Sequence, residues 1–516
     1  MHIDARYLDD HTNIEGDICI VGSGAAGISF ALEWINTPYK VILLEGGGFE
    51  YDNQVQNLYA GKNTGQRYYP LRSSRLHYFG GTTNHWAGMC SPYDPIDFKK
   101  RDWVPHSGWP ITRLDLDPFY ARANKVLELG PYRYDIEYLK EVRPNKETLP
   151  LDEGVVWNKM WQFSPPTRFN KKYRDDIVNA KNIHLYTYAN LTNIIANDSI
   201  NSIDKLELKN HANKTHNVKA KHYVLACGAI QNARMLLASN KQANKGLGNQ
   251  NDLVGRYFME HLEVISAQMF LKKPFAMDLY GFDPKSWTTP RAEIGLTEEI
   301  QEKHQILNGT ISFTPMALTK SQKPMIDVWT SDDPLESEKK LYENFEDYDK
   351  IDRSVKNPYE TNVFELFTRM EQAPNPNSRI TLDSEKDELG VQRAKLHWDL
   401  TELDKHSMRK IYEIFGEAVG KSGIGRVKMY DFLWKANNSE MLKTLGGGWH
   451  HMGTTKMHDD PKQGVVDANC KIHGLSNLFI AGSGCCSTAG APNPTLNLVA
   501  LSLRLSDHLK TLMRNN

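Results

Sequence analysis

The stretch Asp17–Glu45, DICIVGSGAAGISFALEWINTPYKVILLE, decides the fold of this chain. Its first five residues form an apolar run that is long enough for a strand buried on both faces. The run leads into GSGAAG at 22–27, a GxGxxG turn. Apolar residues then follow helical spacing over 28–35, and a second apolar run over 39–45 ends in an acid. This order of strand, glycine turn, helix and strand predicts a βαβ unit that binds a dinucleotide.

Each glycine of that turn has a mechanical purpose in dinucleotide binding. Gly22 allows the tight turn, Gly24 lets backbone amides reach a pyrophosphate, and Gly27 lets the helix pack on the strand. The helix would point its positive end at the phosphates, and Glu45 would accept hydrogen bonds from ribose hydroxyls. The predicted cofactor-binding residues of this segment are Gly22, Gly24, Ala25, Ala26, Gly27 and Glu45. The same fingerprint serves NAD and FAD; its early position and the glycines after Glu45 favour FAD.

Length, composition and charge exclude several classes of protein. A chain of 516 residues is long enough for two or three folding units. Hydrophobic residues at 40% and charged residues at 24% are typical of globular proteins rather than disordered or membrane proteins. The formal net charge of −1 gives no electrostatic case for nucleic acid binding. No run approaches the roughly 20 apolar residues of a membrane helix.

The N-terminal residues and the cysteines favour a cytoplasmic setting. No basic region followed by an apolar stretch opens the chain, so we predict no signal peptide. The six cysteines are scattered without a CxxC pair, which is typical of a reducing compartment. Export together with a partner subunit that carries a signal stays open.

Three further segments resemble the glucose–methanol–choline (GMC) oxidoreductases. They are GGTTNHWAG at 80–88, YVLACGAIQN at 223–232, and the C-terminal region from HHMGTTKM at 450 onward. They occur in the order found in that family, and the resemblance is weakest between 265 and 440. Within the family the pattern is closest to the pyranose oxidase and sugar dehydrogenase branch.

The resemblance implies an α/β fold with a Rossmann-like FAD-binding domain and a discontinuous substrate domain built on an antiparallel sheet. The alternating run ILNGTISF at 306–313 is consistent with antiparallel strands. The charge-rich segment 331–360 is interpreted as a solvated helix with a loop. The predicted bounds are 1–95, 176–260 and 445–516 for the FAD-binding domain, and 96–175 and 261–444 for the substrate-binding domain.

The resemblance also implies a reaction, in which a secondary alcohol of a sugar, glycoside or polyol loses a hydride to flavin N5 and a proton to a histidine. In the family pattern HxxGT the base stands three residues before the glycine, which here gives His450 and leaves His451 a structural role. A buried histidine that only packs the glycine turn is the alternative for His450. The implied partner of the base is Asn493. Asn493 can equally be the N-cap of a helix over 496–509, with Pro494 at its first position.

Further cofactor contacts follow from the resemblance alone. They are Gly81, Thr82, Asn84, His85, Leu191, Ala226, Gly482, Asn493, Pro494 and Thr495. In relatives the histidine corresponding to His85 is bonded covalently to the flavin, and here Asn84 stands where those relatives have threonine. A covalent and a non-covalent FAD therefore both stay open.

Other functions were weighed against this hypothesis. A metal site at His450, His451 and His458 fits no zinc spacing, so we predict no metal. One rival is the catalytic subunit of a multi-subunit dehydrogenase that passes electrons to a cytochrome or quinone. Others are a natural-product tailoring enzyme of the same family and a flavin-bearing binding protein without turnover. The predicted partner is a small alcohol or sugar; the electron acceptor, whether oxygen, a dye, a quinone or a further subunit, stays open.

Overall fold

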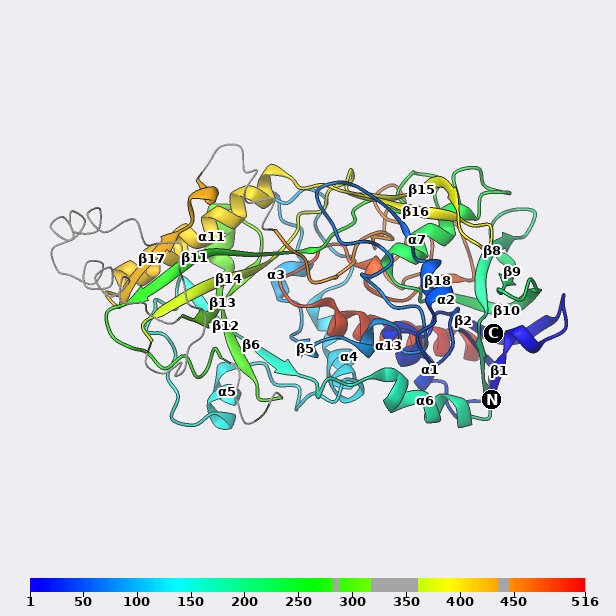
Figure 1. The fold of residues 1–516 in the computed structure, drawn as a ribbon, viewed down its shortest axis with the longest axis horizontal. Coiled ribbons are helices and arrows are strands. Elements are labelled where there is room, and N and C mark those ends of the chain that lie inside the picture. Colours follow the sequence, from blue (N-terminus) through cyan, green and yellow to red (C-terminus); the bar gives the residue numbers. More distant parts are fainter. Residues whose placement is uncertain (282–285, 287, 317–360, 435–444, 516) are drawn as a thin grey trace.

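A computed structural model describes residues 1–281, 286, 288–316, 361–434 and 445–515. The segment 331–360, for which a helix is predicted, lies outside the described residues. Two large sheets stand at opposite ends of the molecule, and the N- and C-termini lie together at one end (Figure 1).

The sheet near the termini is mainly parallel and contains the predicted βαβ unit. Its strand order is β1-β7-β3-β2-β10-β9-β8, and β18 pairs with the C-terminal part of β10, beyond the residues that pair with β9. Only the pairs β10–β9 and β9–β8 are antiparallel. The strands are β1 (His2–Asp4), β2 (Asn13–Val21), β3 (Val41–Leu44), β7 (Ile183–Thr187), β8 (Asn190–Ala196), β9 (Ile203–Lys209), β10 (Thr215–Leu225) and β18 (Leu478–Ile480). Helix α1 (Ala25–Leu32) connects β2 to β3, so the predicted unit is confirmed.

Two glycines let β2, α1 and β10 come close together. Gly22 has φ +102°, and a Cβ there would lie 2.7 Å from the carbonyl oxygen of Ala226. A Cβ on Gly27 would lie 1.9 Å from the carbonyl oxygen of Gly22. A side chain at Gly27 would force the helix away from the sheet, and one at Gly22 would clash with the backbone that follows β10.

The second sheet is antiparallel throughout, with the order β17-β11-β14-β13-β12-β6-β5. Its strands are β5 (Met89–Cys90), β6 (Val156–Phe163), β11 (His261–Leu271), β12 (Arg291–Leu296), β13 (Gly309–Pro315), β14 (Val363–Glu371) and β17 (Gly425–Met429). Helix α11 (Glu402–Lys421) covers one face (Figure 1). The predicted fold class, a Rossmann-like sheet with an antiparallel second sheet, is confirmed. The residue bounds of the two domains stay a prediction.

A small third sheet and several short helices complete the fold. The sheet has the order β15-β16-β4. Its strands are β4 (Gly61–Gly65), β15 (Arg379–Lys386) and β16 (Gln392–Trp398). The remaining helices are α2 (Asn53–Asn57), α3 (Pro95–Phe98), α4 (Arg113–Val126), α5 (Ile136–Val142), α6 (Phe169–Asn179), α7 (Ala229–Ala238) and α8 (Glu298–His304). Short 3-10 turns are η1 (Ala5–Tyr7), η2 (Gly81–Asn84), η5 (Asp431–Leu433) and η6 (Ser483–Cys485).

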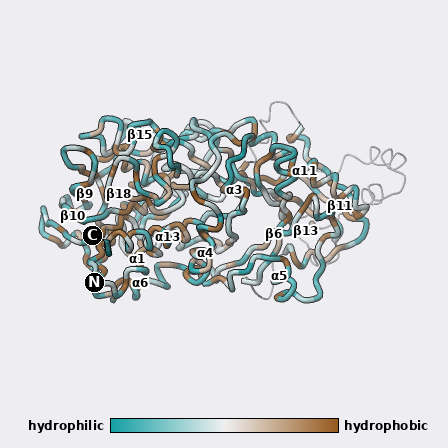
Figure 2. Tube along the Cα trace, turned by 180° about the vertical axis from the view of Figure 1, so that it is seen from behind, coloured by the Kyte–Doolittle hydropathy of each residue, from teal (hydrophilic) through white to brown (hydrophobic). Residues whose placement is uncertain are grey.

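The long C-terminal helix α13 (Pro494–Asn515) runs through the protein core. It packs between α1 and α4, and Leu496, Val499 and Leu503 are fully buried. Hydrophobic residues gather along α13 and α1 (Figure 2). The N-terminus of α13 points toward the middle of the molecule, away from the chain ends (Figure 1). In the part of the chain that the structure describes, no helix combines the length and the apolar character of a membrane span.

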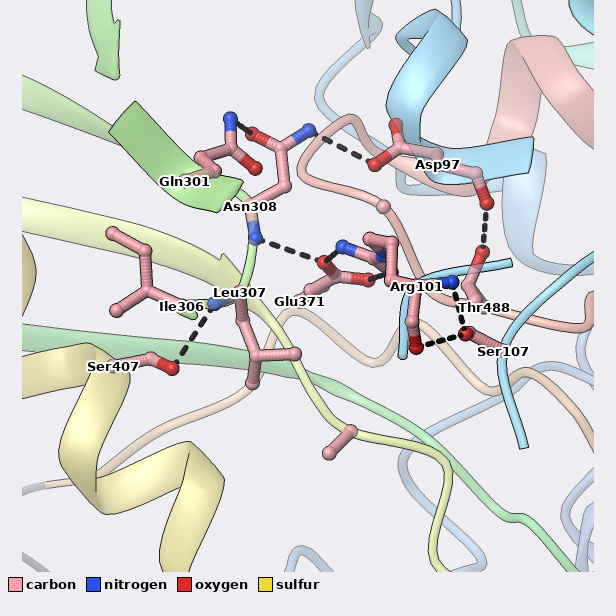
Figure 3. A network of polar contacts seen from close by, with 12 residues as sticks. Asp97, Arg101, Ser107, Gln301, Ile306, Leu307, Asn308, Glu371, Ser407 and Thr488 are labelled. Atoms are coloured by element: carbon pink, nitrogen blue, oxygen red, sulfur yellow. Dashed lines mark hydrogen bonds and ion pairs between the residues drawn. The ribbon is translucent and has the colours of Figure 1, made fainter. Parts of the chain in front are cut away.

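A buried polar network joins the antiparallel sheet to the C-terminal loop (Figure 3). Arg101 and Glu371 form a bidentate ion pair, with side chains 1% and 0% exposed. The backbone N–H of Asn308 donates to Glu371 (2.8 Å), and its side-chain amide donates to Asp97 (2.9 Å). Thr488 donates to the carbonyl oxygen of Asp97 at 2.6 Å. The network thus connects β14, the residues around α3 and the loop before α13.

We expect Glu371→Gln to destabilise the protein, because it leaves the Arg101 guanidinium buried without its counter-charge. Breaking one partner of a buried ion pair costs about 3–5 kcal/mol. The free energy of unfolding from urea titrations measures the loss. The matched control is Glu385→Gln, which removes a 56% exposed partner of Arg393 and should cost less than about 1 kcal/mol. Equal effects of the two variants would contradict this account of the network.

Candidate active site

A cavity of about 580 Å³ lies where the glycine turn after β2 meets the loops before α13. Most of the predicted site residues line it: Gly22, Gly24, Ala25, Ala26, Glu45, Gly81, Thr82, His85, Leu191, Ala226, His450, Gly482, Asn493, Pro494 and Thr495. Two do not. Gly27 packs against Gly22, which is the role predicted for it. The Asn84 amide donates to the carbonyl oxygen of Phe79 (2.9 Å), so the structure turns it away from the cavity.

Three glycine loops form one end of the cavity and leave room for a phosphate group. A Cβ on Gly24 would meet no atom within 4 Å, and one on Gly482 would approach only the Ala26 side chain, at 3.8 Å. A Cβ on Gly81 would lie 3.0 Å from the Cα of Gly24, so these two loops are in close contact. The N-terminus of α1 opens beside them at Ala25. Bare backbone beside a helix N-terminus is suited to a pyrophosphate.

Glu45 provides the carboxylate predicted for the ribose. It is fully buried at the end of β3, accepts from the Ser23 hydroxyl at 2.6 Å, and accepts from the Gly47 N–H at 2.9 Å. Burial raises the pKa of Glu45, and these donors partly offset that shift. The backbone N–H of Ser23 also donates to Glu45, at 3.2 Å, so protein donors occupy at least three of the roughly four acceptor positions of this carboxylate.

Several polar atoms on the cavity wall have no protein partner. Among the described residues, the Oδ1 of Asn493, the Nε2 of His451 and the Oε1 of Gln231 are buried without a hydrogen bond. Buried polar atoms of this kind normally have a partner. Together with the glycine loops and Glu45, these atoms fit a large polar cofactor such as FAD.

The side chain of Asn493 differs from the sequence-based prediction in one detail, the hydrogen bond that would cap helix α13. Helix α13 begins at Pro494, as expected. The side-chain oxygen of Asn493 nevertheless makes no capping hydrogen bond. The residue precedes the first residue of the helix and also lines the cavity.

The orientation of the His450 imidazole follows from a short chain of hydrogen bonds. His450 Nδ1 lies 2.7 Å from His261 Nδ1, and His261 Nε2 lies 2.7 Å from the carbonyl oxygen of Gly490. Because a carbonyl oxygen only accepts, His261 carries its proton on Nε2 and accepts at Nδ1. His450 therefore donates from Nδ1, which leaves a lone pair on its Nε2.

Electrostatics keep both imidazoles uncharged. Burial, then the neighbouring His261 and Arg369, holds the pKa of His450 well below its ordinary value. Burial also lowers the pKa of His261 to about 3. A carboxylate lies nearby: Glu260 accepts from the backbone N–H of His450 (2.8 Å) and the hydroxyl of Tyr68 (2.6 Å). Burial raises the pKa of Glu260 to about 7.

Glu260, His261 and His450 have ligand atoms close enough to suggest a metal site, since these atoms lie within 4.8 Å of one another. Two nitrogen ligands of a tetrahedral ion with bonds of about 2.0–2.1 Å stand roughly 3.3 Å apart. The two Nδ1 atoms are only 2.7 Å apart. A hydrogen bond accounts for that separation. We therefore describe His261 and His450 as a hydrogen-bonded pair of imidazoles and not as metal ligands.

His85 and His451 occupy different parts of the wall. The His85 ring stacks on Trp449 at a centroid distance of 5.6 Å, and burial lowers the pKa of His85. The carbonyl oxygen of His451 accepts from the Ser483 hydroxyl at 2.6 Å, which connects the loop that carries His450 and His451 to η6. That contact is consistent with the structural role predicted for His451.

Four residues of the site carried no predicted role: Glu260, His261, Glu263 and Arg369. A usable signal existed in the spacing, because charged or imidazole side chains alternate with apolar ones at 261, 263, 369 and 371. Such alternation predicts a strand with one polar face.

Comparison with known proteins agrees with this geometry. A family model described as GMC oxidoreductase matches residues 374–502. A second model, described as FAD dependent oxidoreductase, matches residues 17–246.

Two curated relatives and one solved structure are similar over almost their whole length. The 2-methyl-1,2-propanediol dehydrogenase of Mycolicibacterium austroafricanum is 23% identical and covers 96% of this chain and 95% of its own. The fructose dehydrogenase large subunit of Gluconobacter japonicus is 23% identical and covers 96% and 97%. The crystal structure of a formate oxidase superposes with a TM-score of 0.59 at 16% identity, over 98% of this chain and 100% of its own.

We expect the rate of flavin reduction, which depends on proton uptake by His450, to fall on the acidic side only well below pH 6.5. A base accepts a proton only in its neutral form, which predominates above its pKa, and burial lowers that pKa. The check is the rate of reduction of the bound flavin as a function of pH. A limb at or above pH 6.5 would contradict the neutral, buried imidazole.

The hydrogen-bond chain is tested in the same profile with His261→Phe, which keeps a ring but removes the acceptor. The reduction rate should fall by about 10- to 100-fold, as for partners that orient metal-bound histidines. Substrate KM should change little, since His261 has no free polar atom toward the cavity.

Proposed function

The chain belongs to the GMC oxidoreductase family of FAD-dependent enzymes that act on CH–OH groups, and on that premise we propose that it oxidises a secondary alcohol of a sugar, glycoside or polyol to a ketone. When bound, FAD supplies the acceptor for the hydride that leaves the carbon. The protein has to bind the alcohol, orient it and remove its hydroxyl proton.

The observation that carries this proposal is the lone pair on Nε2 of His450. It is fixed by the hydrogen-bond chain through His261 to Gly490, in a cavity that also holds Asn493. The substrate O–H bond breaks, its proton moves to Nε2, and the C–O bond becomes a carbonyl as the hydride leaves. Asn493 lines the same cavity and is suited to hold the substrate oxygen, because its side-chain amide N–H can donate to that oxygen.

One neighbour of His450 offsets part of the cost of the charge that develops there, which burial, His261 and Arg369 oppose. The imidazole becomes a cation when it takes the proton. The nearest carboxylate oxygen of Glu260 lies 4.0 Å from Nδ1 of His450, and an opposite charge at this distance favours the charged form. The N-terminus of α13 faces the same cavity at Pro494 and Thr495, so its positive end stabilises negative charge in the site.

The relatives support a substrate with several hydroxyl groups. The two described above act, by their names, on 2-methyl-1,2-propanediol and on fructose. Both compounds carry hydroxyl groups on adjacent carbons. At 23% identity the individual substrate does not transfer, so the proposal is limited to the class.

A second candidate concerns the electron acceptor. One relative is named as the large subunit of a dehydrogenase, which favours a chain that passes electrons to a cytochrome or quinone instead of oxygen. Substrates found with an anaerobic dye acceptor should then fail to turn over in air. Turnover in air with oxygen consumption would favour an oxidase. The cytoplasmic setting stays a prediction from the sequence.

We expect His450→Ala to bind FAD and to lose alcohol-dependent bleaching of the flavin. Loss of a general base typically costs about 10²–10⁴-fold in rate. Stopped-flow absorbance under anaerobic conditions, with a panel of sugars, glycosides and polyols, measures the loss. His11→Ala, at a histidine 78% exposed on the surface, is the matched control.

Two results would count against the proposal. Bleaching that persists in His450→Ala would remove this residue from proton transfer. A wild-type flavin that no alcohol of the panel bleaches would remove the proposed substrate class.

We further propose His85 as the point of covalent attachment to FAD. Its imidazole lies on the cavity wall in an exposed residue, and partial burial lowers its pKa, which favours the neutral, nucleophilic form. Acid precipitation of the holoenzyme should leave a yellow pellet. Precipitated His85→Ala should be colourless, with FAD in the supernatant. A colourless wild-type pellet would show that FAD is held without a bond.

A further inference from the structure

One face of the antiparallel sheet presents polar side chains to the cavity. His261 pairs with Glu371, and Glu263 pairs with Arg369, in the register of β11 and β14. Alternate residues of a strand point to the same face, so these four side chains share one side. The other side carries residues such as Thr368, which bonds to Tyr412 of α11. Glu263 and Arg369 therefore face the cavity beside the histidine pair.

Arg369 is held in place by two carboxylates. Its Nε donates to Oε1 of Glu263 at 3.0 Å, and its Nη1 lies 3.6 Å from Oε2 of Glu293. Glu293 is almost fully buried and accepts from the Thr310 hydroxyl at 2.7 Å. Arg291 lies beside Glu293 at 3.2 Å. The guanidinium of Arg369 is therefore fixed before any ligand arrives.

The cavity edge of this pair is left open. Among the described residues, no donor reaches Oε2 of Glu263, and Nη2 of Arg369 donates to no protein acceptor. The two side chains are 19% and 10% exposed, and both residues line the cavity that contains His450. Ligand pockets commonly keep a few such polar groups to orient a ligand.

The chemistry of these two groups selects their ligand. A carboxylate oxygen accepts, and a guanidinium N–H donates, in a fork of fixed geometry. A hydroxyl group both donates and accepts, so two hydroxyls on adjacent carbons can bind the two groups together. The charges of Glu263, Glu293, Arg291 and Arg369 sum to zero, which favours a neutral ligand over a sugar acid or an amino sugar.

We propose that Glu263 and Arg369 bind two adjacent hydroxyl groups of the substrate, so that the enzyme selects neutral vicinal polyols. This inference rests on the proposed function, because it takes the oxidised carbon to lie at His450. The pair would set which carbon is presented to the base, while His450 and Asn493 act on the hydroxyl that is oxidised. The pair orients the substrate and takes no part in bond breaking.

The test compares two ring alcohols that differ by one hydroxyl group, trans-1,2-cyclohexanediol and cyclohexanol. Their binding is measured by titration calorimetry on holoenzyme whose flavin has first been reduced with dithionite, so that neither is oxidised. The wild type should bind the diol at least about 10-fold more tightly, as hydrogen bonds to charged groups provide.

Glu263→Gln replaces one of the two carboxylate oxygens by an amide nitrogen and removes the negative charge. It should abolish the preference for the diol, with little change in the binding of cyclohexanol. Arg369→Lys keeps the charge, loses the fork, and should reduce the preference. Glu385→Gln, at an exposed ion pair remote from the cavity wall, should leave it unchanged. Retained FAD and a single cooperative melting transition show that each variant is folded.

The outcomes separate this inference from the proposed function. Equal binding of the two alcohols by the wild type, or a full diol preference in Glu263→Gln, would overturn the role of the pair. Reduction of the oxidised flavin is measured separately. Diol-selective binding without flavin reduction by any alcohol would overturn the proposed reaction and leave the pair as a polyol-binding site.

Discussion

The carbonyl oxygen of Gly490 can only accept a hydrogen bond, and the direction of every bond from it to the reaction site follows from that fact. It fixes the proton of His261 on Nε2, and thereby the lone pair of His450 on the opposite nitrogen. The position of residue 490 matters accordingly. Its φ is +62°, and a Cβ would lie 2.8 Å from a carboxylate oxygen of Asp97, so glycine is required. A backbone atom thus governs the protonation of two side chains.

The polar network explains how that backbone atom is held. Asp97 and Thr488 are joined by a hydrogen bond, and Trp109 donates to Thr488 at 2.8 Å. The same network reaches Glu371, which stands opposite His261 in the sheet (Figure 3). The strand that positions the second histidine and the loop that supplies its carbonyl partner are therefore fixed to one another. Two polar side chains farther along the same strands form the wall proposed to bind substrate.

The local parts of this architecture could be predicted from the sequence. The β2–α1–β3 unit, the strand at 309–315 and the start of α13 depend on neighbouring residues, and glycine or proline marks their limits. His450 and Asn493 followed only from resemblance. The partners of His450 could not be predicted, because β11 and β14 are distant in sequence and their register depends on tertiary packing. A pattern also cannot show where a side chain points, which is why the capping bond of Asn493 was expected and is absent.

The glycine loops that surround the cofactor cavity come from opposite ends of the chain, at Gly24 and Gly482. β18, just before Gly482, completes the parallel sheet beside β10. The nucleotide fingerprint and the other half of its enclosure are therefore far apart in sequence, and only the folded sheet brings them together. A cavity wall with both glycine loops in place therefore requires β18 to pair with β10, and without that pairing this part of β10 is an open sheet edge.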